Sequence, residues 1–371
     1  MTLLETTEKL AQDPFQAYME STGLPIYRGH HVADLRTVEL AWWPERECNA
    51  AFTELAGQEG ITEGRITEIP AGKSLPPFRS AVDELVYVVS GQGIATVATD
   101  GRPKKTFEWQ KFSLFLLPGG VTYQLANMQG DQPARLLHYS YMPLAMSLVM
   151  DHELLFNPPH ETPDRIYNED NPYAEAQLKL GRGWGSRNMR QVWTGNFFPD
   201  MRGWDKLNNL SGRGAGGASV MMRYPGSEVS SHMSVFPPGT YKKGHRHGPG
   251  RIIVIPGGEG FSIMWEEGHE KVIVPWQEAS MFVPPDRWFH QHFNLGGTQA
   301  RYLALHPPPQ FYGRSEQVED RERDQIEYPD EDPFVRNYFE EELAKRGLKT
   351  LMPEECYKDY NYTFAAAIAG D

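Results

Sequence analysis

The sequence predicts a mainly β protein that contains two copies of one domain, each folded as a barrel or jelly roll. The chain has 371 residues, which is more than one ordinary hydrophobic core organises. Short apolar or alternating segments recur between many of its 35 glycines and 29 prolines, as is typical of short strands joined by turns. A stretch that starts at Asp83, DELVYVVSGQGIATV, has a counterpart that starts at Gly250, GRIIVIPGGEGFSIM. A repeat of this length indicates a duplicated domain, because solenoid repeats are much shorter.

One constant offset relates the two copies. Gly91 and Gly93 correspond to Gly258 and Gly260, which lie 167 residues later. The offset also relates three further pairs over 56 ungapped positions: Gly72 with Gly239, Pro118 with Pro285, and Asn127 with Asn294.

Each copy contains several expected strands. In the first copy they lie at 84–89, 93–99, 111–117 and 134–141, and in the second at 251–255, 261–265, 271–275, 280–283 and 301–305. We therefore expect five parts: an N-terminal arm (1–60), an N-terminal barrel (61–144), a connecting segment (145–216), a C-terminal barrel (217–310) and a tail (311–371). The tail includes the helical pattern DPFVRNYFEEELAKRG, in which Phe334, Tyr338 and Leu343 are expected to dock on a barrel.

Composition and charge exclude several classes of function. The net charge is −13 and there is no long basic run, which argues against nucleic acid as a partner, since phosphate binding needs a basic patch. No apolar run approaches the roughly 18 residues that a membrane span needs. The start MTLLETTEKLAQDPF lacks a basic region followed by an apolar one, so no secretory signal is expected. The two cysteines, Cys48 and Cys356, are far apart, which favours a reducing cytoplasmic location.

Three histidines form a candidate metal site in the second copy. His245 and His247 are two residues apart, so on a strand both side chains point to the same face. His290 is expected on a distant strand that faces them across the barrel. Three imidazoles that converge in this way suit iron, nickel, copper or zinc and leave positions open for substrate or water. The alternative is that these are ordinary polar residues of a strand or turn.

The spacing of these residues resembles the two motifs of the cupin superfamily, and in particular its two-barrel members, the bicupins. The first cupin motif is Gly, five residues, His-x-His, three or four residues, Glu, six residues, Gly, and Gly239, His245, His247 and Gly258 match it. The second motif, Pro-x-Gly-x-x-His-x-x-x-Asn, matches PDRWFHQHFN at 285–294, with Arg287 in place of the glycine. The resemblance implies two cupin barrels, also called double-stranded β-helix or jelly-roll barrels.

Arg251 stands where many metal cupins, including oxalate decarboxylases and flavonol dioxygenases, have a glutamate ligand. A guanidinium stays charged and cannot bind a cation. If the strand keeps its alternation, Arg251 faces the same interior as His247 and can bind an anionic substrate through two hydrogen bonds. Alternatively, Arg251 pairs with an internal carboxylate or turns outward.

A ligand set of three histidines without a carboxylate resembles that of the iron-dependent bicupins that cleave gentisate, salicylate or hydroxynaphthoate. WFHQHFN, from Trp288 to Asn294, is similar to their second motif. The resemblance implies an Fe(II)-dependent dioxygenase that cleaves a C–C bond of a small hydroxylated aromatic or enolisable acid, with O₂ as co-substrate. Arg251 and His292 would be catalytic, the first binding a carboxylate and the second orienting substrate, moving protons or serving as a fourth ligand. In that family, however, the metal usually lies in the N-terminal barrel.

Other functions are compatible with the same fold and motif residues. One alternative is a non-oxidative hydrolase, lyase or isomerase that depends on zinc, manganese or nickel, and another is a non-catalytic binding protein like the seed globulins. The first copy has Phe78, Ser80 and Tyr123 at the three ligand positions and keeps only Glu84. We therefore expect no transition metal there and a structural role for that barrel. The resemblance to bicupins also implies a homo-oligomer, a dimer or tetramer.

Overall fold

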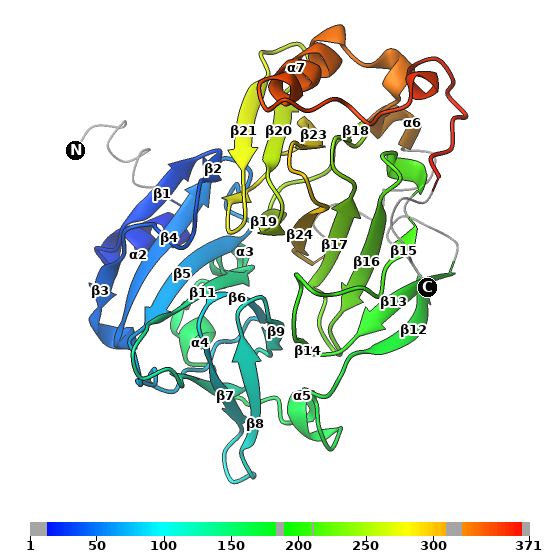
Figure 1. Ribbon diagram of the computed structural model, residues 1–371. Helices are drawn as coiled ribbons and strands as arrows, with labels where there is room; N and C mark the ends of the chain where they lie inside the picture. The colour runs from blue at the N-terminus through cyan, green and yellow to red at the C-terminus, as the bar shows by residue number, and fades with distance from the viewer. Residues whose placement is uncertain (1–12, 183–188, 210, 309–320, 366–371) are drawn as a thin grey trace, which may run out of the picture.

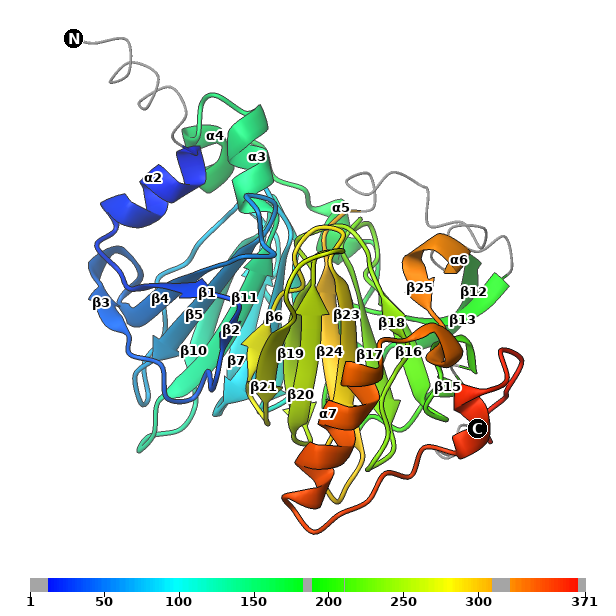
Figure 2. The same cartoon turned by 90° about the horizontal axis from the view of Figure 1, so that it is seen from above.

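The computed structural model describes residues 13–182, 189–209, 211–308 and 321–365. They form two β-barrels side by side, each made of one large sheet and one small sheet (Figures 1 and 2). The predicted fold class is confirmed as a mainly β protein with two barrels in one chain. Within these ranges no helix is long and apolar enough to cross a membrane.

The N-terminal barrel has a large sheet with the order β1-β4-β5-β11-β6-β9-β14, to which β3 adds beside β4, and a small sheet with the order β10-β7-β8. Its strands are β1 (Ile26–Gly29), β3 (Ala41–Trp43), β4 (Cys48–Leu55), β5 (Glu63–Ile69), β6 (Glu84–Ser90), β7 (Gln92–Ala98), β8 (Lys105–Gln110), β9 (Leu114–Leu117), β10 (Thr122–Asn127), β11 (Ala134–Ser140) and β14 (Phe197–Phe198).

The C-terminal barrel has a large sheet with the order β12-β13-β16-β17-β24-β19-β22-β2, to which β15 adds beside β16, and a small sheet with the order β21-β20-β23-β18-β25. Its strands are β2 (His31–Val32), β12 (Gln177–Arg182), β13 (Met189–Thr194), β15 (Asn208–Asn209), β16 (Ala218–Arg223), β17 (Ser230–Phe236), β18 (Gly244–His245), β19 (Ile252–Gly257), β20 (Gly260–Trp265), β21 (Val272–Trp276), β22 (Met281–Phe282), β23 (Phe289–Asn294), β24 (Ala300–His306) and β25 (Gln325–Ile326).

The two barrels exchange short strands. β2 comes from the segment expected as an N-terminal arm but pairs with β22 of the C-terminal barrel. β14 comes from the connecting segment but pairs with β9 of the N-terminal barrel. The described part of the arm also contributes β1, β3 and β4 to the N-terminal barrel. Parts of the predicted arm (1–12), connecting segment (183–188 and 210), C-terminal barrel (309–310) and tail (311–320 and 366–371) lie outside the described residues.

Successive residues of the large-sheet strands face alternately the interior of their barrel and the interface between the two barrels. On β19, Ile252 and Val254 belong to a core that also contains Leu85 and Tyr87 of β6. Ile253, between the first two, faces the interior of its own barrel. Because successive strand residues point to opposite faces, each large sheet buries one face inside its barrel and the other against the second barrel.

Helices cover the outside of the barrels. They are α2 (Pro14–Ser21), α3 (Met142–Leu148), α4 (Glu153–Phe156), α5 (Asp164–Tyr167), α6 (Arg321–Asp324) and α7 (Pro333–Ala344).

Helix α7 is the helix expected in the tail, and it packs against the small sheet of the C-terminal barrel (Figure 2). Asp332 caps its first turn by accepting a hydrogen bond from the Phe334 amide, and Pro333 occupies the first helical position, where its missing N–H costs nothing. The buried face consists of Val335, Phe339 and Leu343. Phe334 was expected to dock but is exposed, because it lies one residue away from this stripe.

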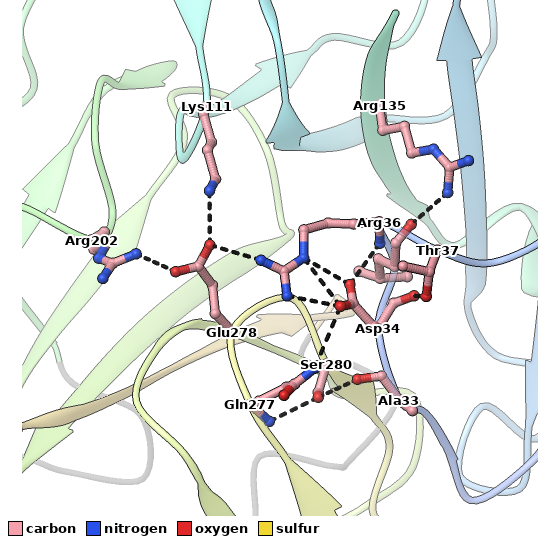
Figure 3. A network of polar contacts seen from close by, with 11 residues as sticks. Ala33, Asp34, Arg36, Thr37, Lys111, Arg135, Arg202, Gln277, Glu278 and Ser280 are labelled. Carbon is pink, nitrogen blue, oxygen red and sulfur yellow. Dashed lines mark hydrogen bonds and ion pairs between the residues drawn. The ribbon is translucent and has the colours of Figure 1, made fainter. Parts of the chain in front are cut away.

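A carboxylate joins the two barrels at the turn between β21 and β22. Glu278 accepts hydrogen bonds from Lys111 of the N-terminal barrel (2.8 Å), from Arg36 of the N-terminal segment (3.4 Å) and from Arg202 of the connecting segment (Figure 3). Arg36 also pairs with Asp34 (2.7 Å). This network ties three distant parts of the chain to one side chain of the C-terminal barrel.

Candidate metal centre

Strand pairing brings the three predicted histidines together. His245 on β18 lies directly opposite His290 on β23, and the equivalent residues of the first copy, Phe78 and Tyr123, form a bridge of the same kind. The potential ligand nitrogens of His245, His247 and His290 all lie within 4.8 Å of one another, and no other group of this kind occurs in the described residues.

Backbone carbonyls fix the orientation of all three rings. The Nδ1 atoms of His245, His247 and His290 lie 3.3, 2.7 and 3.1 Å from the carbonyl oxygens of Lys243, Gly248 and Trp288 respectively. A carbonyl only accepts, so each Nδ1 carries the proton and donates it. Each Nε2 then keeps its lone pair, the arrangement that metal-binding histidines show when their other nitrogen donates to a second partner.

Burial keeps these imidazoles neutral. It lowers the pKa of His290 to about 3 and lowers the pKa of His245 and His247 well below the ordinary value. The charge of Arg213 acts in the same direction on His245 and His290, and the charge of Arg251 does so on His247 and His290. The buried Nε2 of His290 has no hydrogen-bond partner, which is costly unless a ligand or ion satisfies it. Three neutral nitrogen donors and an unsatisfied acceptor fit a transition metal.

Arg251 lies in the interior of the same barrel. It precedes β19 and shares the parity of Ile253, and its side chain is buried. Its charge lowers the pKa of His247 and of His306, second to the effect of burial. By its parity Arg251 points into the interior of the barrel, on the face where the sequence analysis expects it.

His292 differs from the three candidate ligands in which of its ring nitrogens carries the proton. Its Nδ1 lies 2.8 Å from the hydroxyl of Ser262, which also accepts a hydrogen bond from the indole of Trp276 at 3.1 Å. All three groups are satisfied when the Ser262 hydroxyl donates to Nδ1. The Nε2 of His292 then carries a proton, so this ring is suited to donate a hydrogen bond rather than to serve as a fourth ligand.

Four further interior groups are not among the candidate residues of the sequence analysis. His232 on β17 and His306 on β24 lie 2.7 Å apart (Nδ1 to Nε2). Tyr302 lies beside His292, with 4.6 Å between ring centroids. Lys242 is buried, with its ammonium against Ser234. The repeat offers a signal for Lys242, because the residue at its position in the first copy is the buried Leu75.

Arg287 adopts the conformation of the glycine that it replaces. Its φ is 59°, and Gly120 at the equivalent position of the first copy has a φ of 74°. A non-glycine residue in this region is strained. Here the side chain pairs with Asp324, which also binds Arg246. These pairs fasten the α6–β25 segment beside the metal centre.

In the N-terminal barrel, internal partners fill the corresponding site. The carboxylate of Glu84 lies 2.8 Å from His138 Nδ1, 3.1 Å from the Tyr123 hydroxyl and 2.6 Å from Arg65. Arg65 also pairs with Glu63. Burial opposes ionisation of Glu84, but His138 and Arg65 hold its pKa well below the usual range. The single carboxylate that the first copy retains is therefore neutralised by protein groups.

Comparisons with known proteins identify similar folds among solved structures. No protein-family profile and no curated protein matches the sequence. The chain is similar to oxalate decarboxylase from Lactobacillus farciminis in complex with formate, with 12% identity, a TM-score of 0.48, and coverage of 75% of this chain and 86% of that one. Oxalate decarboxylase from Bacillus subtilis, described with its Mn(II) centres, gives 10% identity, a TM-score of 0.47, and coverage of 75% and 76%. Identities this low say nothing about the reaction, and the resemblance to ring-cleaving dioxygenases is not confirmed.

Proposed function

We propose that this protein is a metal-dependent enzyme whose centre, formed by His245, His247 and His290, acts on a small anionic substrate without net oxidation. The reaction class is that of a lyase, isomerase or hydrolase. The single observation that carries the proposal is the convergence of three neutral imidazoles, oriented by backbone carbonyls, in an interior where the described residues also bury Lys242 and Arg251.

The charge of the interior favours an anion. Within the described ranges the buried carboxylates are Glu63, Asp83, Glu84 and Asp324. All four form ion pairs with arginines, and the first three belong to the N-terminal barrel. The buried lysine and arginine side chains of the C-terminal barrel, within the same ranges, are Lys242 and Arg251. A divalent ion on three neutral ligands adds positive charge, so a carboxylate, enolate or similar anion would compensate for it.

The residues of the chain have separate tasks in this proposal. A bound metal would supply Lewis acidity that polarises oxygen atoms of the substrate. Arg251 binds a substrate carboxylate through two N–H groups. His292 donates a hydrogen bond from Nε2 to developing negative charge on the substrate, and Ser262 keeps its ring in that tautomer. The apolar residues of the interior, among them Phe282 and Met264, exclude water from these groups.

The oxidative alternative uses the same ligands. The motif WFHQHFN and the absence of a carboxylate ligand both favour an Fe(II)-dependent dioxygenase acting on a hydroxylated aromatic or enolisable acid. Iron, zinc, manganese, nickel and copper all accept imidazole nitrogen, so metal analysis and oxygen consumption distinguish the two proposals.

The test combines elemental analysis with a substrate screen. Purified protein should contain one metal ion per chain, and His290→Ala should lose most of it. The matched control His269→Ala removes a histidine that is exposed and should retain the metal. Turnover of small carboxylic acids is then followed under argon and in air with an oxygen electrode. Conversion under argon supports the non-oxidative proposal, and strictly oxygen-dependent conversion supports the dioxygenase. Full metal occupancy in His290→Ala would exclude both.

A further inference from the structure

A second polar cluster lies in the C-terminal barrel beside the metal centre. We call it the inner cluster, and it consists of four buried side chains: Lys242, Ser262, His292 and Tyr302. Tyr302 links the cluster together, because its ring lies 4.6 Å from the His292 ring and 5.5 Å from the Lys242 ammonium. His292 in turn lies 5.6 Å, between ring centroids, from the proposed ligand His290. The cluster is thus continuous with the metal centre.

The first copy shows how this barrel is filled when no such cluster is needed. The 167-residue offset places Leu75, Ala95 and Leu125 at the positions of Lys242, Ser262 and His292. Strand register places Leu136 at the position of Tyr302, since Leu136 lies opposite Thr67 as Tyr302 lies opposite Ser234. All four residues of the first copy belong to one apolar core. The fold therefore accepts apolar residues at every position of the inner cluster.

Lys242 is the member of the inner cluster whose burial destabilises the fold most. Its side chain is 1% exposed, and within the described ranges its ammonium contacts the Ser234 hydroxyl and the rings of Phe236 and Tyr302 but no carboxylate. An ammonium has three donors, and one hydroxyl satisfies one of them. Burial, helped by the charge of Arg213, lowers the pKa of Lys242 to about 7. A buried charge without a counter-charge destabilises a fold, so the position calls for a ligand.

We propose that Lys242, assisted by Ser234 and Tyr302, binds a second acidic group of the substrate, so that the substrate is a dicarboxylate or an equivalent dianion with one group at the metal centre and the other at the ammonium. This inference rests on the proposed function and deepens it by naming the substrate class. One acidic group meets Arg251 and the metal ligands, and the remote group supplies the counter-charge that Lys242 lacks.

The experiment measures anion binding by isothermal titration calorimetry on the metal-loaded protein. The probes are matched pairs: malonate with propionate, succinate with butyrate, and glutarate with valerate. At least one dicarboxylate should bind about 30-fold or more tightly than its monocarboxylate partner. This is the affinity expected to be lost when one member of a buried charged pair is absent. Lys242→Met and Lys242→Leu, the second of which copies Leu75, should abolish this preference and leave monocarboxylate affinity unchanged.

The neighbouring lysine is a matched control. Lys243 pairs with Glu327 and lies against the ring of Tyr328 on the outer face of the small sheet, so Lys243→Met should keep the preference. Both Lys242 variants should also melt at a higher temperature, because an apolar residue replaces a buried charge. A preference that persists without Lys242, a wild-type protein without any preference, or Lys242 variants that are less stable would each overturn the inference.

Metal content, measured on the same samples, separates this inference from the proposed function. Absence of metal from the wild-type protein contradicts the proposed function alone, and titration of that protein still decides whether Lys242 confers dicarboxylate binding. Normal metal content in every variant, with no effect of Lys242 on affinity, contradicts this inference alone.

Discussion

At the scale of single residues, the proposed function depends most on Arg251. It is buried and shares the parity of Ile253, which faces the interior of the C-terminal barrel, and its charge lowers the pKa of His247. In the first copy the same position holds Glu84, which forms an ion pair with Arg65 and contacts His138. The two copies therefore place opposite charges at one position, and the positive one is next to the candidate ligands.

We predict that Arg251→Ala retains the metal but loses activity. Loss of a charge-assisted pair with a substrate carboxylate costs about 2–5 kcal/mol, so kcat/KM should fall about 30-fold or more. Lysine restores the charge without the two-pronged geometry, so Arg251→Lys should recover only part of the activity. Kinetics with a carboxylate substrate and with its amide make the measurement specific, because only the carboxylate should lose rate. Equal losses for both substrates would mean that Arg251 supports the fold instead.

The candidate ligands were predictable from the sequence, whereas the inner cluster was not. His245, His247 and His290 stand out because their spacing is local and matches a motif. Tyr302 becomes meaningful only through strand register, and the one sequence signal for Lys242 is its correspondence with the apolar Leu75 of the first copy. His292 was recognised as an inward residue, but its hydrogen bond with Ser262 depends on the pairing of β20 with β23.

At the scale of elements, the tail segment that carries α7 closes the small sheet of the C-terminal barrel. Glu331, which precedes α7, accepts hydrogen bonds from the Tyr241 hydroxyl and from Gln291 (3.1 Å). Gln291 follows the ligand His290 on β23 and points to the outer face. Burial raises the pKa of Glu331 to about 7.

This carboxyl should make the protein less stable as the pH rises. The folded state binds a proton that the unfolded state releases at its ordinary pKa of 4.5. The free energy of unfolding therefore falls as pH increases from about 4.5 to about 7. Glu331→Gln should remove this fall. Relative to the wild type, the free energy of unfolding of the variant should therefore rise by about 1–3 kcal/mol between pH 5 and pH 8. Urea unfolding at the two pH values is the measurement. Glu354→Gln, which changes an exposed carboxylate paired with Arg336, is the control and should shift stability little at either pH. A pH dependence of Glu331→Gln identical to that of the wild type would refute this account.

The strands of both copies were predictable where apolar periodicity was long. β6, β7, β11, β19, β20, β21 and β24 all begin and end close to their expected positions. The connecting segment was different, since no strand was expected there and it contributes β12, β13, β14 and β15. β14 and β15 have two residues each, too few to show a period. On β12, Leu178 and Leu180 alternate with polar residues, but both are exposed. β12 is the edge strand of its sheet, so this alternation does not mark a buried face.

At the scale of the whole molecule, the duplication was visible in the sequence but the union of the two barrels was not. One apolar core contains side chains from the large sheets of both barrels, including Ile66 and Leu137 from the first and Met233 and Leu303 from the second. Backbone contacts continue it, since the Gly250 amide donates to the Gly57 carbonyl at 2.7 Å. Such contacts depend on how two folded units meet, which no local pattern encodes.

We predict that the two barrels unfold together. Neither large sheet can expose the face that forms the shared core without exposing many apolar side chains to water, and that cost couples the two unfolding equilibria. Exchange of β2 and β14 adds to the coupling, because each barrel holds a strand that chain order assigns to the other. Differential scanning calorimetry should therefore show one transition, with a van't Hoff enthalpy close to the calorimetric enthalpy.

Removing the carboxylate that joins the barrels tests this coupling directly. Glu278→Ala leaves Lys111, Arg36 and Arg202 without their shared partner. Because all four side chains are partly exposed, the expected loss is modest, about 1–2 kcal/mol. The single transition should move to lower temperature as a whole and stay single, since the shared apolar core remains. Glu175→Ala is the control, because it breaks the exposed pair with Lys206 within one region of the surface and should leave the transition in place. Two separate transitions in the wild-type protein, or splitting of the transition in Glu278→Ala, would show that ion pairs rather than the shared core hold the barrels together.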